Sequence, residues 1–195
     1  IVIGDEIKED SKETISYLNN HGYETIMLTG DNELIASHVA KQLGIKQYRY
    51  SLLPQNKVEE VEKIILNKNK NDVVCFVGDG INDAPVLMRS DVGVSMGGVG
   101  SDAAIEASDI VLMHDNLSSL VTAKKIAKKT KTIVVENIIF AIAIKLLIMI
   151  ASIIVIGILQ IDFPMMWFSV FGDVGVAVIA ILNAMRANIN KSKYK

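Results

Sequence analysis

The sequence predicts an α/β domain with a parallel, Rossmann-like sheet, followed by two transmembrane α-helices. In residues 1–123, short apolar runs that end at glycine or polar turns alternate with helical stretches. Residues 138–158 and 164–185 are instead almost wholly apolar, and each is long enough to cross a hydrocarbon core of about 30 Å. We therefore divide the chain into the α/β domain (1–123), a basic linker helix (124–136), a membrane part (137–186) and a basic tail (187–195).

Each element of the α/β domain is predicted from its own pattern. The expected strands lie at 1–3, 23–28, 48–50, 72–77, 92–96 and 110–113. The expected helices lie at 9–20, 33–43, 53–66 and 85–88. Gly22 and Gly44 end the first two helices, and Pro54 opens the third. Strands that alternate with helices favour a parallel sheet covered by helices on both faces.

Composition excludes some classes of protein. The single cysteine, Cys75, rules out a disulfide framework within the chain, and its place in an apolar strand predicts core packing. The net charge of −2 gives no reason to expect a nucleic-acid partner. The amino terminus has no secretory signal and starts on a strand-like run, so we expect it to be a cut rather than a natural beginning.

The most informative motif is VGDGINDAPVL at 77–87. It places Asp79 and Asp83, with Asn82 between them, after an apolar strand, where ligands bind in open α/β sheets. Mg²⁺ prefers such hard oxygen ligands, so the pair predicts a magnesium site. Alternatively, Asp83 caps the helix that begins near Ala84, and the two roles are compatible.

A phosphate site is predicted at the same edge of the sheet. Thr29 and Lys57 fall at or near strand ends, and Gly30 and Asp31 continue the turn that Thr29 begins. A hydroxyl, an ammonium and a magnesium-binding acid pair would surround a phosphoryl group, whose transfer needs positioning and charge stabilisation. Thr29 could instead be an ordinary turn residue, and Lys57 a solvated helix lysine.

Basic residues predict how the membrane part is oriented. They flank both apolar stretches, whereas the connecting loop, 157–164, has none. By the positive-inside rule, both ends and the α/β domain are cytoplasmic and the loop is outside. The lysines of 124–131 could also form the solvated face of an amphipathic helix.

Two charges interrupt the apolar stretches. At 1.5 Å per residue, Lys145 lies about 10 Å from the cytoplasmic boundary and Asp173 about 17 Å, so an extended lysine could reach the carboxylate. A charge at the bilayer centre costs about 3 kcal/mol, and such residues usually mark function. Asp173 could bind a divalent cation, with Lys145 neutralising it when empty, or the two could form a purely structural ion pair. Gly172 and Gly175 would let another helix approach closely.

Three motifs carry a family resemblance: MLTGDN at 27–32, LLPQNK at 52–57 and VGDGINDAPVL at 77–87. In order and spacing they resemble the phosphorylation domain of the P-type ATPases, in the haloacid dehalogenase superfamily. The stretch 91–113 resembles the heavy-metal-transporting branch. The resemblance implies that Asp79 coordinates Mg²⁺ with Asn82 and Asp83, and that Thr29 and Lys57 hold the phosphoryl group. It also implies that ATP binds mainly to a nucleotide domain outside this chain.

The phosphorylated aspartate of that family lies in a D-K-T-G-T sequence, which does not occur here. The chain therefore resembles the carboxyl-terminal third of such an enzyme, and we expect it to be inactive alone. Two alternatives stay open. One is a non-catalytic membrane module that works with a separately encoded partner. The other is a membrane-anchored phosphatase with Asp5 as nucleophile, although Ile7 stands where soluble members carry a second aspartate.

The resemblance also implies a cargo and a location. A lysine in the penultimate helix and Asp-Val-Gly in the last are similar to the zinc/cadmium/lead exporters. The copper branch typically has Tyr-Asn where this chain has Glu136-Asn137. Met149, Met165 and Met166 could act as thioether ligands, but we expect packing roles. The implied partners are a divalent cation, membrane lipid and the upstream part of the pump, in a bacterial plasma membrane.

Overall fold

The computed structural model describes residues 7–78, 81–97, 102–160 and 165–187. The chain divides into two compact units, residues 1–121 and 122–195, called here the α/β unit and the hairpin unit. Each unit is described by itself.

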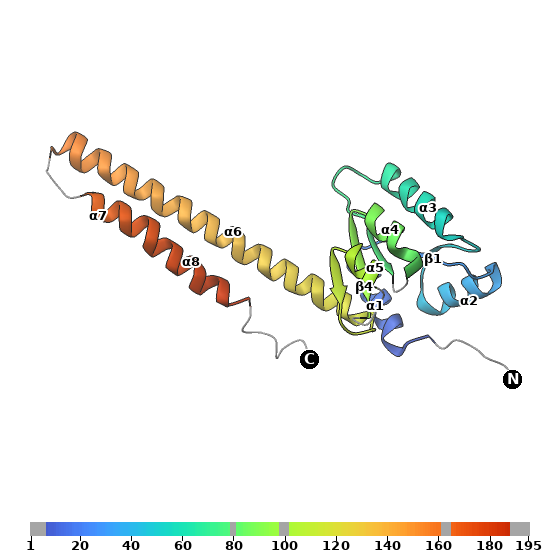
Figure 1. Cartoon of the computed structure of the whole chain (residues 1–195). Helices are drawn as coiled ribbons and strands as arrows, with labels where there is room; N and C mark the ends of the chain where they lie inside the picture. The colour runs from blue at the N-terminus through green and yellow to red at the C-terminus, as the bar shows by residue number, and fades with distance from the viewer. Residues whose placement is uncertain (1–6, 79–80, 98–101, 161–164, 188–195) are drawn as a thin grey trace. The chain divides into compact units, whose positions relative to one another are not determined.

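The α/β unit has parallel strands in two sheets rather than in one (Figure 1). The first sheet pairs β1 (Ile26–Leu28) with β2 (Gln47–Arg49). The second pairs β3 (Cys75–Gly78) with β4 (Val92–Met96), and β4 with β5 (Ile110–Leu112). Among the described strands, none pairs with the second edge of β1 or of β3. The expected strand at 1–3 lies outside the described residues.

One prediction about β3 is wrong. Cys75 was expected in the core, but its side chain is exposed. The reason is the position of β3 at the edge of its sheet, where no described strand covers the outer side. An apolar run alone does not distinguish a central strand from an edge strand.

The helices of the α/β unit follow the expected pattern closely. They are α1 (Glu9–Asn20), α2 (Glu33–Leu43), α3 (Pro54–Asn67), α4 (Ala84–Arg89) and α5 (Asp102–Glu106). The Asn32 side chain caps α2 by accepting from the Ile35 amide at 3.0 Å, and Gly44 ends it with φ of 73°. The five-residue α5 was not predicted, because so short a helix leaves no periodic signal.

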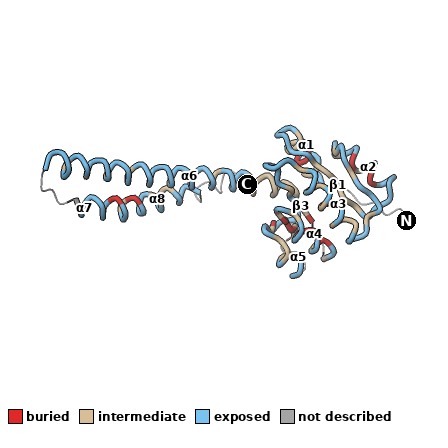
Figure 2. Tube along the Cα trace, turned by 90° about the horizontal axis from the view of Figure 1, so that it is seen from above, coloured by how far each residue is buried: buried red, intermediate tan, exposed pale blue. Residues whose placement is uncertain are grey.

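The core of the α/β unit forms where helices meet the strands. Buried side chains come from α2, α3, α4 and β4, and the largest fully buried ones are those of Leu87, Val61, Val86 and Val94 (Figure 2). Gly93 in β4 is needed for this packing, because a Cβ there would lie 2.7 Å from the Leu87 carbonyl oxygen. The contact between α4 and β4 fixes the carboxyl-terminal end of the VGDGINDAPVL motif, which lies in α4.

The hairpin unit consists of two long helices. The first is α6 (Ser118–Ser152), which continues into a π-helical segment, η2 (Ile153–Ile158), so the linker and first span form one continuous helix. The second comprises α7 (Met165–Val170), the π-helical η3 (Phe171–Gly175) and α8 (Val176–Met185). Each contains a stretch that is long and apolar enough to cross a membrane.

The two helices of the hairpin approach closely at Gly172. A Cβ on this glycine would lie 2.4 Å from the Ile148 Cδ1 atom, so a larger residue would require the end of the Ile148 side chain to move. Gly172 is buried, whereas its neighbour Asp173 is not. The absence of a side chain at this position therefore makes room for Ile148 beside Asp173.

Candidate functional site

Lys57 and Asp83 meet in the α/β unit. The Lys57 ammonium donates to Asp83 Oδ1 at 2.8 Å, and the two side chains are only 20% and 11% exposed. Lys57 lies in the first turn of α3, which Pro54 opens and which the Asn56 side chain stabilises by accepting from the Leu53 amide at 3.3 Å. Two residues that lie 26 positions apart, in the LLPQNK and VGDGINDAPVL motifs, thus form one ion pair.

Asp83 ends a 3₁₀ turn, η1 (Ile81–Asp83), directly before α4. Asp83 occupies the N-cap position of α4, as the helix-start interpretation expected, but its side chain makes no capping hydrogen bond there. Gly78 explains how the carboxylate fits, since a Cβ at this position would lie 2.9 Å from Asp83 Oδ2. The glycine at the end of β3 therefore leaves room for the acid that follows it.

The turn after β1 holds Thr29 and Asp31 together. The Thr29 hydroxyl donates to Asp31 Oδ2 at 2.7 Å and accepts from the Asp31 amide at 3.1 Å. The backbone ties this turn to the segment before α3, through the Leu52 amide to the Thr29 carbonyl at 3.1 Å and the Ser51 amide to the Asp31 carbonyl at 2.7 Å. Ser51 has a positive φ of 52°, which a sharp turn requires. Gly30 lies between Thr29 and Asp31, and a Cβ on it would lie 3.4 Å from the Leu52 carbonyl oxygen, an ordinary contact distance.

The predicted site residues are thus only partly assembled by described contacts. Lys57 binds Asp83, and Thr29 binds Asp31, but no hydrogen bond joins the two pairs within the described part of the chain. Asn82 is exposed, and Asp79 and Gly80 lie outside the described residues. Among the residues described, no group of three or more His, Cys, Asp or Glu could hold a metal ion. The magnesium site therefore stays a prediction.

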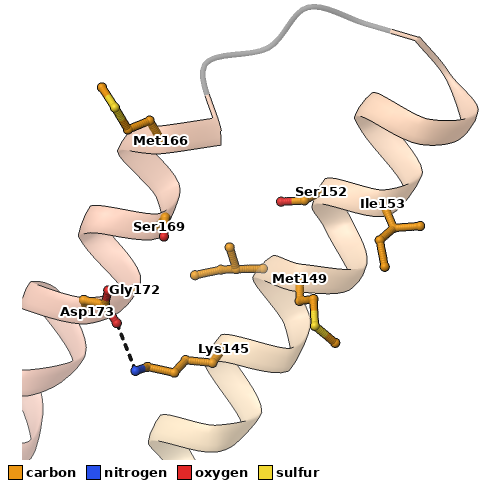
Figure 3. A pocket seen from close by; sticks show the side chains of 9 residues that line it. Lys145, Met149, Ser152, Ile153, Met166, Ser169, Gly172 and Asp173 are labelled. Carbon is orange, nitrogen blue, oxygen red and sulfur yellow. Dashed lines mark ion pairs between the residues drawn. The ribbon is translucent and has the colours of Figure 1, made fainter.

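A second Lys–Asp pair lies in the hairpin unit. The Lys145 ammonium is 3.0 Å from Asp173 Oδ1, so the contact expected from helix depth is present (Figure 3). Asp173 belongs to the π-helical η3, and such segments often occur at functional sites. The pair lines one end of a cavity of about 490 Å³ between the helices. Binding of a metal ion by Asp173 stays a prediction.

A polar cluster that joins the middle of α6 to the end of α8 was not singled out as a site from sequence. Asn183 donates to the Asn137 side-chain oxygen at 2.8 Å, and Asn137 donates to the Ala180 carbonyl at 3.1 Å. Arg186 donates to the Asn183 side-chain oxygen at 2.7 Å and pairs with Glu136 at 3.4 Å. We call these four side chains the clasp: Glu136, Asn137, Asn183 and Arg186. Amides in an otherwise apolar stretch were the signal that could have found it.

Comparison with known protein families matches residues 1–91 to a family of hydrolases, the haloacid dehalogenase-like hydrolases. The chain is 50% identical over 187 residues to a zinc-transporting ATPase from Synechocystis sp., covering 95% of this chain and 25% of that protein. It is 47% identical to a cadmium, zinc and cobalt-transporting ATPase of Bacillus subtilis, covering 99% of this chain and 27% of that one. The chain thus spans about a quarter of the length of these relatives.

Solved structures give the same picture. A crystal structure of a zinc-transporting PIB-type ATPase in its E2.Pi state superposes with a TM-score of 0.78 and 33% identity, covering 94% of this chain and 28% of that one. Phosphoserine phosphatase superposes over 58% of the chain with a TM-score of 0.51 and 22% identity, which shows a shared fold alone.

Proposed function

We propose that this chain, which belongs to the heavy-metal-transporting P-type ATPases, forms part of an ATP-driven pump for a divalent heavy-metal cation: zinc, cadmium or lead. One observation carries the proposal. The same chain holds a Lys–Asp pair at a phosphate-type motif in an α/β unit and a second Lys–Asp pair inside an apolar helical hairpin. A pump must couple phosphoryl chemistry to an intramembrane ion site, and each pair suits one of these tasks.

In this pump the phosphoryl group is carried by an aspartate on an upstream segment, because D-K-T-G-T is absent here. Thr29 donates its hydroxyl to a phosphoryl oxygen, beside Gly30 and Asp31. Lys57 has three N–H donors, of which one binds Asp83 within the described residues, leaving two for phosphoryl oxygens. Asp83 thereby holds the ammonium at the position where charge develops during phosphoryl transfer.

The donor set also suits Mg²⁺. Asp83 makes its one described hydrogen bond through Oδ1, and Oδ2 lies beside the space that Gly78 leaves open. Carboxylate and amide oxygens from Asp79, Asp83 and Asn82 are the hard ligands this ion prefers. When bound there, Mg²⁺ would neutralise charge on the phosphoryl oxygens. ATP itself is bound mainly by the nucleotide domain of the pump.

The transported cation binds Asp173 in the hairpin, and Lys145 neutralises the carboxylate when the site is empty. Both termini and the α/β unit lie in the cytoplasm of a bacterium, and the connection between the helices faces outside, as the distribution of lysine and arginine favours. The remaining metal ligands belong to the upstream part of the pump. A second candidate, a non-catalytic membrane module with a separately made partner, is motivated by the missing D-K-T-G-T sequence.

The test is phosphoenzyme formation from radiolabelled ATP. We would compare the chain alone with a completed pump, in which it replaces the matching quarter of the Synechocystis zinc-transporting ATPase. We expect label in the completed pump only, stimulated by zinc or cadmium and not by copper, and loss of this stimulation in Asp173→Ala. Label on the isolated chain would place the nucleophile within these residues. A completed pump without label would favour the non-catalytic module.

A further inference from the structure

The polar side chains of the hairpin core gather on one cavity. Between 138 and 159, and between 165 and 182, the only side chains with a charge or a hydroxyl are those of Lys145, Ser152, Ser169 and Asp173. All four line the cavity of about 490 Å³ between the helices. Polar groups in a membrane span usually face a protein interior or a water-filled space, so the four polar side chains mark this cavity, whose other lining is apolar, as the place where a polar ligand or water would be held.

The two serines differ from other hydroxyl residues in the same helices. A serine or threonine in a helix commonly donates to the carbonyl four residues earlier, and Thr132 of α6 does so to Lys128 at 3.1 Å. Within the described residues, neither Ser152 nor Ser169 makes a hydrogen bond, although both line the cavity. An unpaired hydroxyl in an apolar span is costly, so these two groups are available for a ligand or for water.

The cavity is lined by polar side chains and by apolar ones, the latter including Met149 and Met166. Ser152 and Ser169 lie on the facing sides of the two helices, on the same side as the Lys145–Asp173 pair, whereas Met166 points away from α6 (Figure 3). Ser169 precedes Asp173 by one turn, about 6 Å along the axis, and Ser152 follows Lys145 by two turns, about 10 Å. Both serines therefore lie between the ion pair and the connection that joins the helices.

We propose that Ser152 and Ser169 form a hydroxyl relay site for a partly hydrated divalent cation, on the outward side of Asp173. This inference rests on the proposed function and adds a second binding site to the path of the transported cation. A cation that leaves Asp173 loses a charged ligand as Lys145 returns to the carboxylate. The two hydroxyl oxygens and water of the cavity then supply neutral oxygen ligands, which hold the cation weakly enough for release.

The position of the relay predicts which kinetic step it affects. Asp173 sets the affinity for metal arriving from the cytoplasm, and the serines act after the metal has left that carboxylate. In the completed pump described above, Ser152→Ala/Ser169→Ala should lower the maximal zinc-stimulated turnover about fivefold, the usual scale for losing one net hydrogen-bond-type contact. The zinc concentration for half-maximal phosphorylation should not change. Ser152→Thr/Ser169→Thr keeps the hydroxyls and should retain turnover.

A second measurement keeps the inference testable if the double alanine variant is poorly folded. Ser152→Cys and Ser169→Cys should react with a hydrophilic, membrane-impermeant thiol reagent added from the outside, and cadmium should protect them. Ala151→Cys and Val170→Cys are matched controls, because each neighbours a serine without lining the cavity. They should react at least several-fold more slowly than the cavity positions.

The outcomes separate the two proposals. If Asp173→Ala abolishes metal stimulation while the double alanine variant equals the parent, and the cavity cysteines react no faster than their controls, the relay is wrong and the pump proposal stands. If Asp173→Ala keeps its metal stimulation, the pump site itself is misassigned. A raised half-maximal zinc concentration with unchanged turnover would also overturn the relay, because it would place the serines in the entry site.

Discussion

Two of the Lys–Asp pairs in the described part of the chain have nearly equal distances and very different surroundings. In the α/β unit, Lys57 and Asp83 are 2.8 Å apart with side chains 20% and 11% exposed. In the hairpin unit, Lys145 and Asp173 are 3.0 Å apart with side chains 64% and 63% exposed within this chain. The first pair is enclosed by its own unit, whereas the second lines an open cavity.

The difference indicates different roles for the same chemistry. An enclosed pair is costly to break, because removal of one partner leaves a desolvated charge. It therefore holds an ammonium in a fixed place, as a phosphoryl site requires. A pair that opens onto a cavity can exchange its partner for a ligand at lower cost, as a transport site requires. We therefore expect the Lys57–Asp83 contact to persist throughout the transport cycle, and the Lys145–Asp173 contact to break when a cation binds.

The largest effect should come from removing the cation of the enclosed pair. Lys57→Met leaves the Asp83 carboxylate without its described partner and should lower the unfolding free energy of the α/β unit by about 2 kcal/mol, within the range for stranded polar groups. Lys145→Met should leave the stability of that unit unchanged. Denaturant unfolding of the full chain, followed by hydrogen exchange of the β3 and α4 amides, measures both.

A double-mutant cycle provides the control for this comparison. If the pair interacts directly, Lys57→Met/Asp83→Asn should be less destabilised than the sum of the two single variants. Additive single effects would show that the cost comes from lost packing of the lysine stem, and the distinction between an enclosed and an exchangeable pair would fail.

A smaller effect should come from the clasp of the hairpin unit. Asn183→Leu removes the hydrogen bond to Asn137 of the other helix, worth about 0.6 kcal/mol on average between membrane helices, and the local one from Arg186. We expect the helices to separate near these positions and metal-stimulated turnover of the completed pump to fall about twofold. Spin-label distances between α6 and α8 would detect the separation. Leu182→Met, a neighbouring exposed position, should leave the distances unchanged.

Most helices and strands could be predicted from the sequence because their signals are local. The α2 helix, for example, begins at the Asn32 cap and ends at Gly44, as a capping residue and a left-handed glycine require. Lys145 and Asp173 could be paired because helix rise converts sequence position into depth. The first inference uses only the residues at the helix ends, and the second uses only the position of each residue along its own helix.

The remaining features depend on packing between distant segments. Cys75 is exposed because no described strand pairs with the second edge of β3, and the sequence of a single strand does not determine its pairing partners. The choice of Asp83 between capping α4 and binding Lys57 depends on where α3 lies. The shared cavity of Ser152 and Ser169 requires the facing sides of two helices to be known. Single serines in apolar stretches carried no signal by themselves.

The smallest effect should come from a third ion pair, Lys68–Asp91, whose side chains are 21% and 32% exposed and which belongs to neither proposed site. Asp91 binds the Lys68 ammonium and accepts from the Val74 amide at 2.7 Å. The hydrogen bond from Lys68, and then that from the Val74 amide, lowers the pKa of Asp91 below its ordinary value. A lowered carboxyl pKa contributes stability above the unfolded pKa of about 3.9, and this contribution is lost as pH falls through the folded pKa.

Asp91→Asn should therefore lower the melting temperature of the α/β unit by about 1–2 °C at neutral pH, the scale of a partly exposed pair. The difference from the parent should shrink as pH falls below about 4, because the parent carboxylate is then protonated too. Thermal denaturation followed by circular dichroism at several pH values measures this. Asp102→Asn, at the start of α5, serves as the control. A difference that persists in acid would mean that Asp91 acts through the geometry of its hydrogen bonds rather than through its charge, and the pH-dependent contribution assigned to this pair would be wrong.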